Sequence, residues 1–226
     1  MPHPVLARNH VAEITGGASG IGFAAAVRFI KAGMRVCVAD LGREKLSRAT
    51  ELLSQVAPAG ADDVMTSETD VSDFAAMQAL ARDVETRFGG VDLLMNNAGI
   101  QVATTATGPR ENWERLLGVN LWGIVNGTQA FAPGMIARGR GARIINTGSK
   151  QGITTPPGNP AYNVSKAGVK AFTEALEHQL RNTEACRVRA HLLIPGFVFT
   201  GLTRGERSEK PAAAWTAEQT VEFMLD

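Results

Sequence analysis

Short apolar runs alternate with longer helical patterns along most of the chain. We predict strands at Val11–Thr15, Arg35–Ala39, Asp63–Thr66, Val91–Met95, Ala142–Thr147 and Val188–Ile194. We predict helices between them at Ile21–Ala32, Arg43–Val56, Asp73–Phe88, Glu111–Ala137 and Ala161–Arg181. Runs such as "RVCVA" and "RIIN" are apolar almost throughout, which is typical of strands covered on both faces. The alternation therefore predicts an α/β fold built on a doubly wound parallel sheet.

The length and punctuation of the chain favour a single domain over residues 1–226. A chain of 226 residues fits one α/β domain with a sizeable core. We find no internal repeat, low-complexity tract or linker. Gly- and Pro-rich stretches such as "GRGAR" and "TPPGNP" are short enough to be loops.

The composition argues against several classes of function. The net charge is +1, from 23 basic and 22 acidic residues without a basic block, so neither nucleic acid nor an anionic membrane is an expected partner. The first ten residues lack the apolar core of a secretory leader, and no segment is long enough to span a bilayer. Cys37 and Cys186 lie far apart in the chain, which favours free thiols and a reducing cytoplasm. No metal-ligand spacing occurs among the histidines and cysteines, so we predict no metal site.

Glu13 conflicts with its surroundings. It lies in the middle of the first predicted strand, which should be central and buried. An unpaired carboxylate there would be costly. We interpret it as a structural feature, either paired with a polar group or destabilising, in preference to a catalytic one.

The first strand runs into "TGGASGIG", Thr15 to Gly22, and then into a helix. Glycines in this position let the backbone turn tightly and let a pyrophosphate approach the free N–H groups of the helix N-terminus. The second strand ends at Asp40, 18 residues beyond Gly22. This is where an acid is expected to hydrogen-bond an adenosine ribose and repel a 2′-phosphate. The alternative is that Asp40 serves only as a turn former or a helix cap.

Tyr162 and Lys166, in "NPAYNVSKAG", are four positions apart and share one face of a predicted helix. An unperturbed tyrosine, with a pKa of ~10, is a poor base at neutral pH. We expect the nearby ammonium to lower the pKa of the phenol and so suit it to proton transfer. The alternative is an ordinary surface pair.

Five stretches together resemble the short-chain dehydrogenase/reductase family. They are "TGGASGIG", "NNAG" (Asn96–Gly99), Asn120, Ser149 and "YNVSK", and they occur in that family's order and at close to its spacings. The resemblance extends from the first strand to about Thr200. It implies a Rossmann-like fold, a nicotinamide cofactor and a Ser–Tyr–Lys set assisted by an asparagine.

The resemblance also implies roles for individual residues. The catalytic set would be Asn120, Ser149, Tyr162 and Lys166, although an asparagine inside a helix can also serve only local bonding. The cofactor-binding set would be Gly16, Ser19, Gly20, Ile21, Gly22, Asp40, Asp70, Val71, Asn97, Ala98, Gly99, Tyr162, Lys166, Pro195, Gly196, Val198 and Thr200.

These residues favour an NAD-dependent enzyme that interconverts a secondary alcohol and a ketone. The alternatives are an NADP-dependent carbonyl reductase and, less favoured, a nucleotide-sensing protein that has lost catalysis. Against NADP, no basic residue lies in the Gly-rich turn or directly after Asp40. We predict Arg43 to be the one nearby cation that could soften this preference. An apolar substrate is indicated by candidate pocket residues: Ile153, Thr154, Phe197, Phe199 and Leu202. Lys150 and Gln151 either touch substrate or face solvent, and the polar stretch after Thr200 suits a mobile lid.

The end of the chain departs from the family pattern. Family members usually carry one further edge strand after the helix that "TAEQTVEFMLD" begins, but no apolar β run follows here. Either the protein is naturally short or its tail is missing. In the family, this strand helps to build a subunit interface. Without it we expect that contact to be weakened, so that a homo-oligomer is held mainly through the two long helices, Glu111–Ala137 and Ala161–Arg181, with a dimer favoured over a tetramer.

Overall fold

The computed structural model describes residues 3–226, and its centre is a sheet of six parallel strands. The strand order is β3-β2-β1-β4-β5-β6. The strands are β1 (Val11–Thr15), β2 (Arg35–Asp40), β3 (Val64–Glu68), β4 (Leu93–Asn96), β5 (Ala142–Thr147) and β6 (Val188–Leu193). The order reverses between β1 and β4, and the carboxyl ends of strands at such a switch point are where α/β sheets bind ligands. The predicted doubly wound parallel fold is confirmed.

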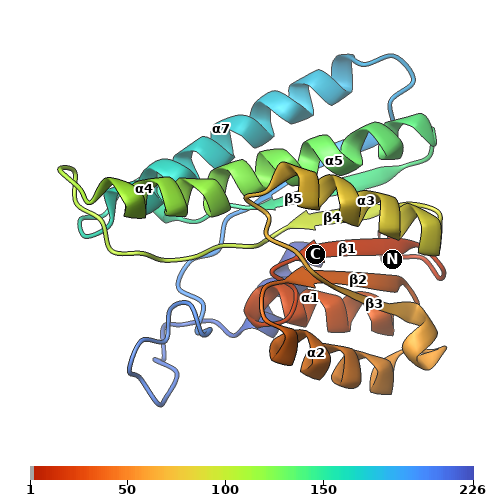
Figure 1. Cartoon of the computed structure of the whole chain (residues 1–226), viewed down its shortest axis with the longest axis horizontal. Helices are drawn as coiled ribbons and strands as arrows, with labels where there is room; N and C mark the ends of the chain where they lie inside the picture. The colour runs from red at the N-terminus through yellow and green to blue at the C-terminus, as the bar shows by residue number, and fades with distance from the viewer. Residues whose placement is uncertain (1–2) are drawn as a thin grey trace.

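Helices cover both faces of the sheet (Figure 1). One face carries α1 (Gly20–Lys31), α2 (Arg43–Val56) and α8 (Ala217–Leu225). The other carries α3 (Phe74–Phe88), α4 (Arg110–Leu117), α5 (Gly123–Ala137) and α7 (Pro160–Asn182). Two apolar cores lie between these layers, one on each side of the sheet, so every central strand is buried on both faces.

The structure changes the prediction in three segments. The helix expected over Glu111–Ala137 is divided into α4, a π-helical turn η2 (Gly118–Trp122) and α5. A short helix α6 (Gln151–Thr154) directly after Ser149 was not predicted. A single 3-10 turn, η1 (Gly60–Asp63), precedes β3.

The sheet ends at β6 within residues 3–226, and a side chain occupies part of that edge. The carboxylate of Glu177 in α7 accepts a hydrogen bond from the backbone N–H of Ala190 at 2.7 Å.

Cys37 and Cys186 are buried and free. In residues 3–226 no helix is long and apolar enough to cross a membrane, and no cluster of acidic, histidine and cysteine side chains could hold a metal ion.

Glu13 is fully buried in β1, and neither of its carboxylate oxygens has a hydrogen-bond partner. It lies between Cys37 of β2 and Leu94 of β4 in the strand register. Burial raises the pKa of its carboxyl group well above the ordinary value of 4.5. The structure therefore shows the Glu13 carboxyl group without a polar partner, which is the second of the two structural interpretations, a destabilising residue.

Candidate active site

The Gly-rich turn is held close to β4 and leads into the N-terminus of α1. Gly16 has φ +64°, and a Cβ there would lie 2.7 Å from Ala98 Cα. A Cβ on Gly22 would lie 2.4 Å from the carbonyl oxygen of Gly16, so Gly22 allows α1 to pack against the turn. Ser19 at the N-cap makes no side-chain cap, which leaves the first N–H groups of α1 available to an anion.

Thr15 and Asn97 join the turn to the end of β4. The hydroxyl of Thr15 accepts hydrogen bonds from the backbone N–H groups of Asn97 and Ala98, at 2.9 and 3.1 Å. The Asn97 amide donates back to the carbonyls of Thr15 and Gly16, at 3.2 and 3.3 Å. Asn97 therefore fixes the shape of the turn as well as facing the cavity.

Helix α7 carries Tyr162 and Lys166, and its start is held by Asn159. The Asn159 side chain accepts hydrogen bonds from the Tyr162 N–H at 3.2 Å and from the Thr104 hydroxyl at 2.7 Å. Its amide donates to the Val102 carbonyl at 2.9 Å. Because the cap ties the first turn of α7 to the loop after β4, the tyrosine has a fixed position beside that loop.

Ser149 lines the same cavity as Tyr162, and the helix that follows it, α6, packs closely on α7. A Cβ on Gly152 of α6 would lie 2.5 Å from the carbonyl carbon of Lys166, so only glycine permits this approach. The Ser149 hydroxyl accepts a hydrogen bond from the Gln151 N–H at 3.2 Å, which orients it at the start of α6.

Burial is the main cause of the pKa shifts of Tyr162 and Lys166. It raises the pKa of the Tyr162 phenol above its ordinary value of 10.0, and the nearby Ser149 hydroxyl lowers that pKa by less. Burial also lowers the pKa of the Lys166 ammonium to about 8. The ammonium donates to the Thr147 carbonyl at 2.8 Å and lies 5.7 Å from the centre of the tyrosine ring. The expected net lowering of the phenol's pKa is therefore not found.

Asn120 lies in η2 with its side chain turned to the neighbouring loop. Its Oδ1 accepts from the Ile100 N–H at 2.8 Å, and its Nδ2 donates to the Ile100 carbonyl at 3.0 Å. The side chain is fully buried and does not line the cavity. It holds the loop after β4, which leaves local positioning as the role that its contacts support.

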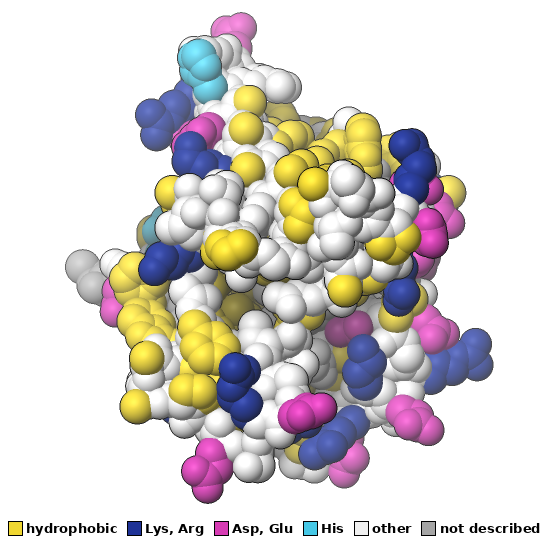
Figure 2. All heavy atoms as spheres, turned by 90° about the vertical axis from the view of Figure 1, so that its left-hand side faces the viewer, with side chains coloured by type: hydrophobic (Ala, Val, Ile, Leu, Met, Phe, Trp, Pro, Cys, Tyr) yellow, Lys and Arg dark blue, Asp and Glu magenta, His cyan; other side chains and the backbone are white. Residues whose placement is uncertain are grey.

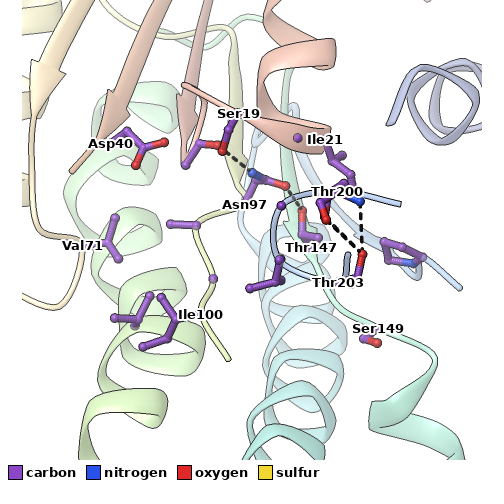
Figure 3. Close-up of a pocket in the computed structure, with 18 of the residues that line it drawn as sticks. Ser19, Ile21, Asp40, Val71, Asn97, Ile100, Thr147, Ser149, Thr200 and Thr203 are labelled. Atoms are coloured by element: carbon purple, nitrogen blue, oxygen red, sulfur yellow. Dashed lines mark hydrogen bonds between the residues drawn. The ribbon is translucent and has the colours of Figure 1, made fainter. Parts of the chain in front are cut away.

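Most of the predicted site residues line one cavity of about 310 Å³ at the carboxyl ends of the strands, a volume within the range of small-molecule sites. The lining includes Gly16, Ser19, Gly20, Ile21, Asp40, Asp70, Val71, Asn97, Ala98, Gly99, Ser149, Tyr162, Lys166, Pro195, Gly196, Val198 and Thr200. Gly22 and Asn120 are the two predicted site residues outside it. In Figure 3, Asp40 and Ser149 lie toward opposite ends of the cavity.

Of the five candidate substrate-pocket residues, one lines this cavity. Leu202 lines the cavity, but Ile153, Thr154, Phe197 and Phe199 do not. The sequence reasoning also missed lining residues, of which the polar or flexible ones are Lys45, Thr69, Thr147, Gly148, Gly201 and Thr203. Thr147 ends β5 and Gly148 directly follows it, and ligands bind at the carboxyl ends of parallel strands, so these two positions alone could have indicated a place in the site. Figure 2 faces this side of the molecule, where hydrophobic side chains gather in patches and charged ones lie mostly toward the rim.

The loop after β6 is ordered around Thr200 and Thr203 (Figure 3). The Thr203 hydroxyl accepts from the Thr200 N–H at 3.1 Å and donates to the Val198 carbonyl. Val198 and Trp215 form an isolated bridge that closes the loop. The loop is thus anchored at both ends beside the cavity.

Comparison with known proteins gives the family. The model described as short chain dehydrogenase matches residues 10–211. The chain belongs to the short-chain dehydrogenase/reductase family. Short-chain dehydrogenases/reductases similar to it include "3beta-hydroxysteroid dehydrogenase 2" of Eggerthella lenta, 32% identical over 98% of this chain and 82% of the relative. Another is "2-(R)-hydroxypropyl-CoM dehydrogenase" of Xanthobacter autotrophicus, 32% identical over 87% of this chain and 77% of the relative.

A solved short-chain dehydrogenase/reductase from Burkholderia phymatum, in complex with NAD, has a similar fold. It superposes with a TM-score of 0.87 and 32% identity over 96% of this chain and 84% of its own. As a member of this family, the chain is an oxidoreductase with a small-molecule substrate.

Proposed function

We propose that the protein is an NAD-dependent dehydrogenase that interconverts a secondary alcohol and a ketone. The observation that carries the proposal is that Ser149, Tyr162 and Lys166 line the same cavity as the Gly-rich turn. The naming of related dehydrogenases and the NAD complex of a similar structure support it. The intact Tyr–Lys pair argues against a protein that only senses nucleotides.

The residues present fit a nicotinamide dinucleotide. The uncapped start of α1 offers backbone N–H groups, and Gly16 and Gly20, which carry no side chain, leave space for a pyrophosphate. Asp40 at the end of β2 would hold the adenosine ribose, and the loop from Pro195 to Thr200 would hold the other end. When bound, the nicotinamide supplies or accepts the hydride.

The chain's own residues would handle the proton. In ketone reduction Tyr162 gives its phenolic proton to the substrate oxygen, and in alcohol oxidation it takes that proton back. Ser149 hydrogen-bonds the same oxygen and holds it beside the phenol. The positive charge of Lys166 stabilises the phenolate left after proton donation. An apolar substrate side chain would lie near Leu202.

The test is a panel of secondary alcohols and ketones, including ring-containing ones, offered with NAD and with NADP. Turnover is followed by the absorbance of the reduced nicotinamide. We expect at least one alcohol to be oxidised, with NAD preferred. Binding of NAD without turnover across a broad panel would favour the nucleotide-sensing alternative. Better use of NADP than of NAD would favour the reductase alternative.

A further inference from the structure

Asp40 shares the ribose end of the cavity with a cation. The ammonium of Lys45, in the first turn of α2, lies 3.3 Å from Asp40 Oδ1, and both residues line the cavity. The lysine stem passes over Gly42, where a Cβ would lie 3.2 Å from Lys45 Cε. The Asp40 side chain is 13% exposed and that of Lys45 is 55% exposed, so the ammonium sits on the solvent side of the carboxylate.

Arg43, the cation predicted from the sequence to soften the preference for NAD, points elsewhere. Its guanidinium pairs with Glu68 at 3.0 Å, its side chain is 90% exposed, and it does not line the cavity. Lys45 therefore provides the positive charge that faces Asp40. Since the two cations lie two positions apart but have different partners, they form a natural comparison.

The hydrogen bonds of Asp40 leave one place for a ribose hydroxyl. A carboxylate has about four acceptor positions, two on each oxygen. Oδ1 accepts from the Leu41 N–H at 2.7 Å and from Lys45, and Oδ2 accepts from the Ala18 N–H at 3.1 Å. One position on Oδ2 remains. A ribose 2′-hydroxyl can donate to it, whereas a 2′-phosphate cannot and is repelled by the carboxylate.

We propose that Lys45 is a specificity-determining residue that softens the preference for NAD over NADP. Its ammonium reduces the repulsion between the Asp40 carboxylate and a 2′-phosphate, and it lies where it can pair with that phosphate. Such a phosphate would be held as a charge-assisted ion pair at a half-exposed position. The site then takes NAD first and keeps measurable affinity for NADP. This inference rests on the proposed function, because it concerns the same cofactor site.

The experiment measures binding of two fragments, so it does not depend on turnover. Adenosine 5′-monophosphate and adenosine 2′,5′-bisphosphate are titrated calorimetrically at low salt into the parent protein and its variants. The discrimination is the ratio of the two dissociation constants. Lys45→Met should weaken the bisphosphate about fivefold relative to the monophosphate, as expected for one charge at a partly exposed site. Lys45→Glu should increase the discrimination further, and Lys45→Arg should keep it near the parent value.

The matched control is Arg43→Met, which removes the same charge from the same helix turn and should leave the ratio within twofold. Asp40→Ser should change the ratio in the opposite direction by relieving the repulsion of the bisphosphate. An unchanged ratio in Lys45→Met and Lys45→Glu, or an equal change in Arg43→Met, would overturn the role of Lys45. If the parent protein binds neither fragment nor NAD, the proposed function fails instead.

Discussion

Tyr162 is the only tyrosine in the chain, so the ionisation of its phenol can be measured without signals from other tyrosines. It is buried, and burial raises the pKa of its phenol. A raised pKa keeps the phenol protonated at neutral pH, so it is prepared to donate a proton in ketone reduction. Lys166, with a pKa of about 8, is still mostly charged at pH 7 and can support the phenolate that forms.

Replacing Tyr162 by phenylalanine keeps the ring and removes the proton. We expect turnover to fall by ~10²-fold or more, the scale of general acid–base catalysis, while cofactor binding is largely kept. Steady-state rates and a cofactor titration on the same preparation separate the two effects. Turnover equal to that of the parent would exclude Tyr162 as the proton-transfer group.

The phenol itself can be titrated by its ultraviolet absorbance. In the free protein we expect a midpoint above the ordinary pKa of ~10, because burial disfavours the phenolate. Alcohol oxidation, which needs the phenol to accept a proton, should become faster as the pH rises into the alkaline range, and ketone reduction should become slower. The Tyr162→Phe variant is the blank, since it contains no tyrosine. A midpoint below the ordinary value would mean that Lys166 outweighs burial.

Helix α6 is the element that brings Ser149 to α7, and Gly152 is where the two helices touch. Adding a methyl group there forces the backbones apart, so Gly152→Ala should cost ~1–3 kcal/mol of stability and lower turnover by moving Ser149. Gly134→Ala in α5 is the control, because a Cβ there meets nothing within 4 Å. In a helix that change should be neutral or stabilising by up to ~1 kcal/mol. Equal effects of the two substitutions on the unfolding midpoint would contradict this account.

Strand β1 carries an unpaired carboxyl group in the apolar core, and its effect should depend on pH. Because the pKa of Glu13 is raised on folding, the folded protein keeps a proton that the unfolded chain releases above the ordinary value of 4.5. Stability is then fully present below that pH and is lost as the pH rises beyond it. Glu13→Leu should remove this loss and stabilise the protein by ~1–3 kcal/mol at pH 7.

Denaturant unfolding of the parent and of Glu13→Leu at acidic and neutral pH measures the effect. The gain should shrink toward acidic pH, where the parent's carboxyl group is protonated in both states. A variant less stable than the parent at pH 7 would indicate that the carboxyl group has a stabilising partner.

The sequence predicts the elements well where a local pattern determines them. The apolar strands and the turn from Thr15 to Gly22 follow from periodicity and glycine placement, and the structure reproduces them. The π-helical turn η2 was not predicted. The Asn120 side chain within it bonds to Ile100, twenty residues away, and no local pattern indicates such a contact. The position of Lys45 beside Asp40 likewise depends on how α2 leaves β2.

The outer face of the molecule beside α5 and α7 exposes large apolar side chains. Trp122 in η2 is 58% exposed and Val164 in α7 is 49% exposed. The two elements pack tightly, because a Cβ on Gly168 of α7 would lie 3.1 Å from the Leu121 side chain. Exposed apolar groups on neighbouring elements are typical of surfaces that bind another protein.

We therefore expect a homodimer formed through this face, as the long helices suggested from the sequence. The double variant Trp122→Glu and Val164→Glu should weaken association by ~10-fold or more, because aromatic anchors dominate such interfaces. Phe223→Glu is the matched control: this side chain is 64% exposed but lies on α8, on the opposite face of the sheet. Sedimentation or light scattering over a range of concentrations measures the oligomeric state. A monomeric parent protein would refute the interface. If Phe223→Glu weakened association as much as the double variant does, the interface would not be specific to the α5–α7 side, where Trp122 and Val164 lie.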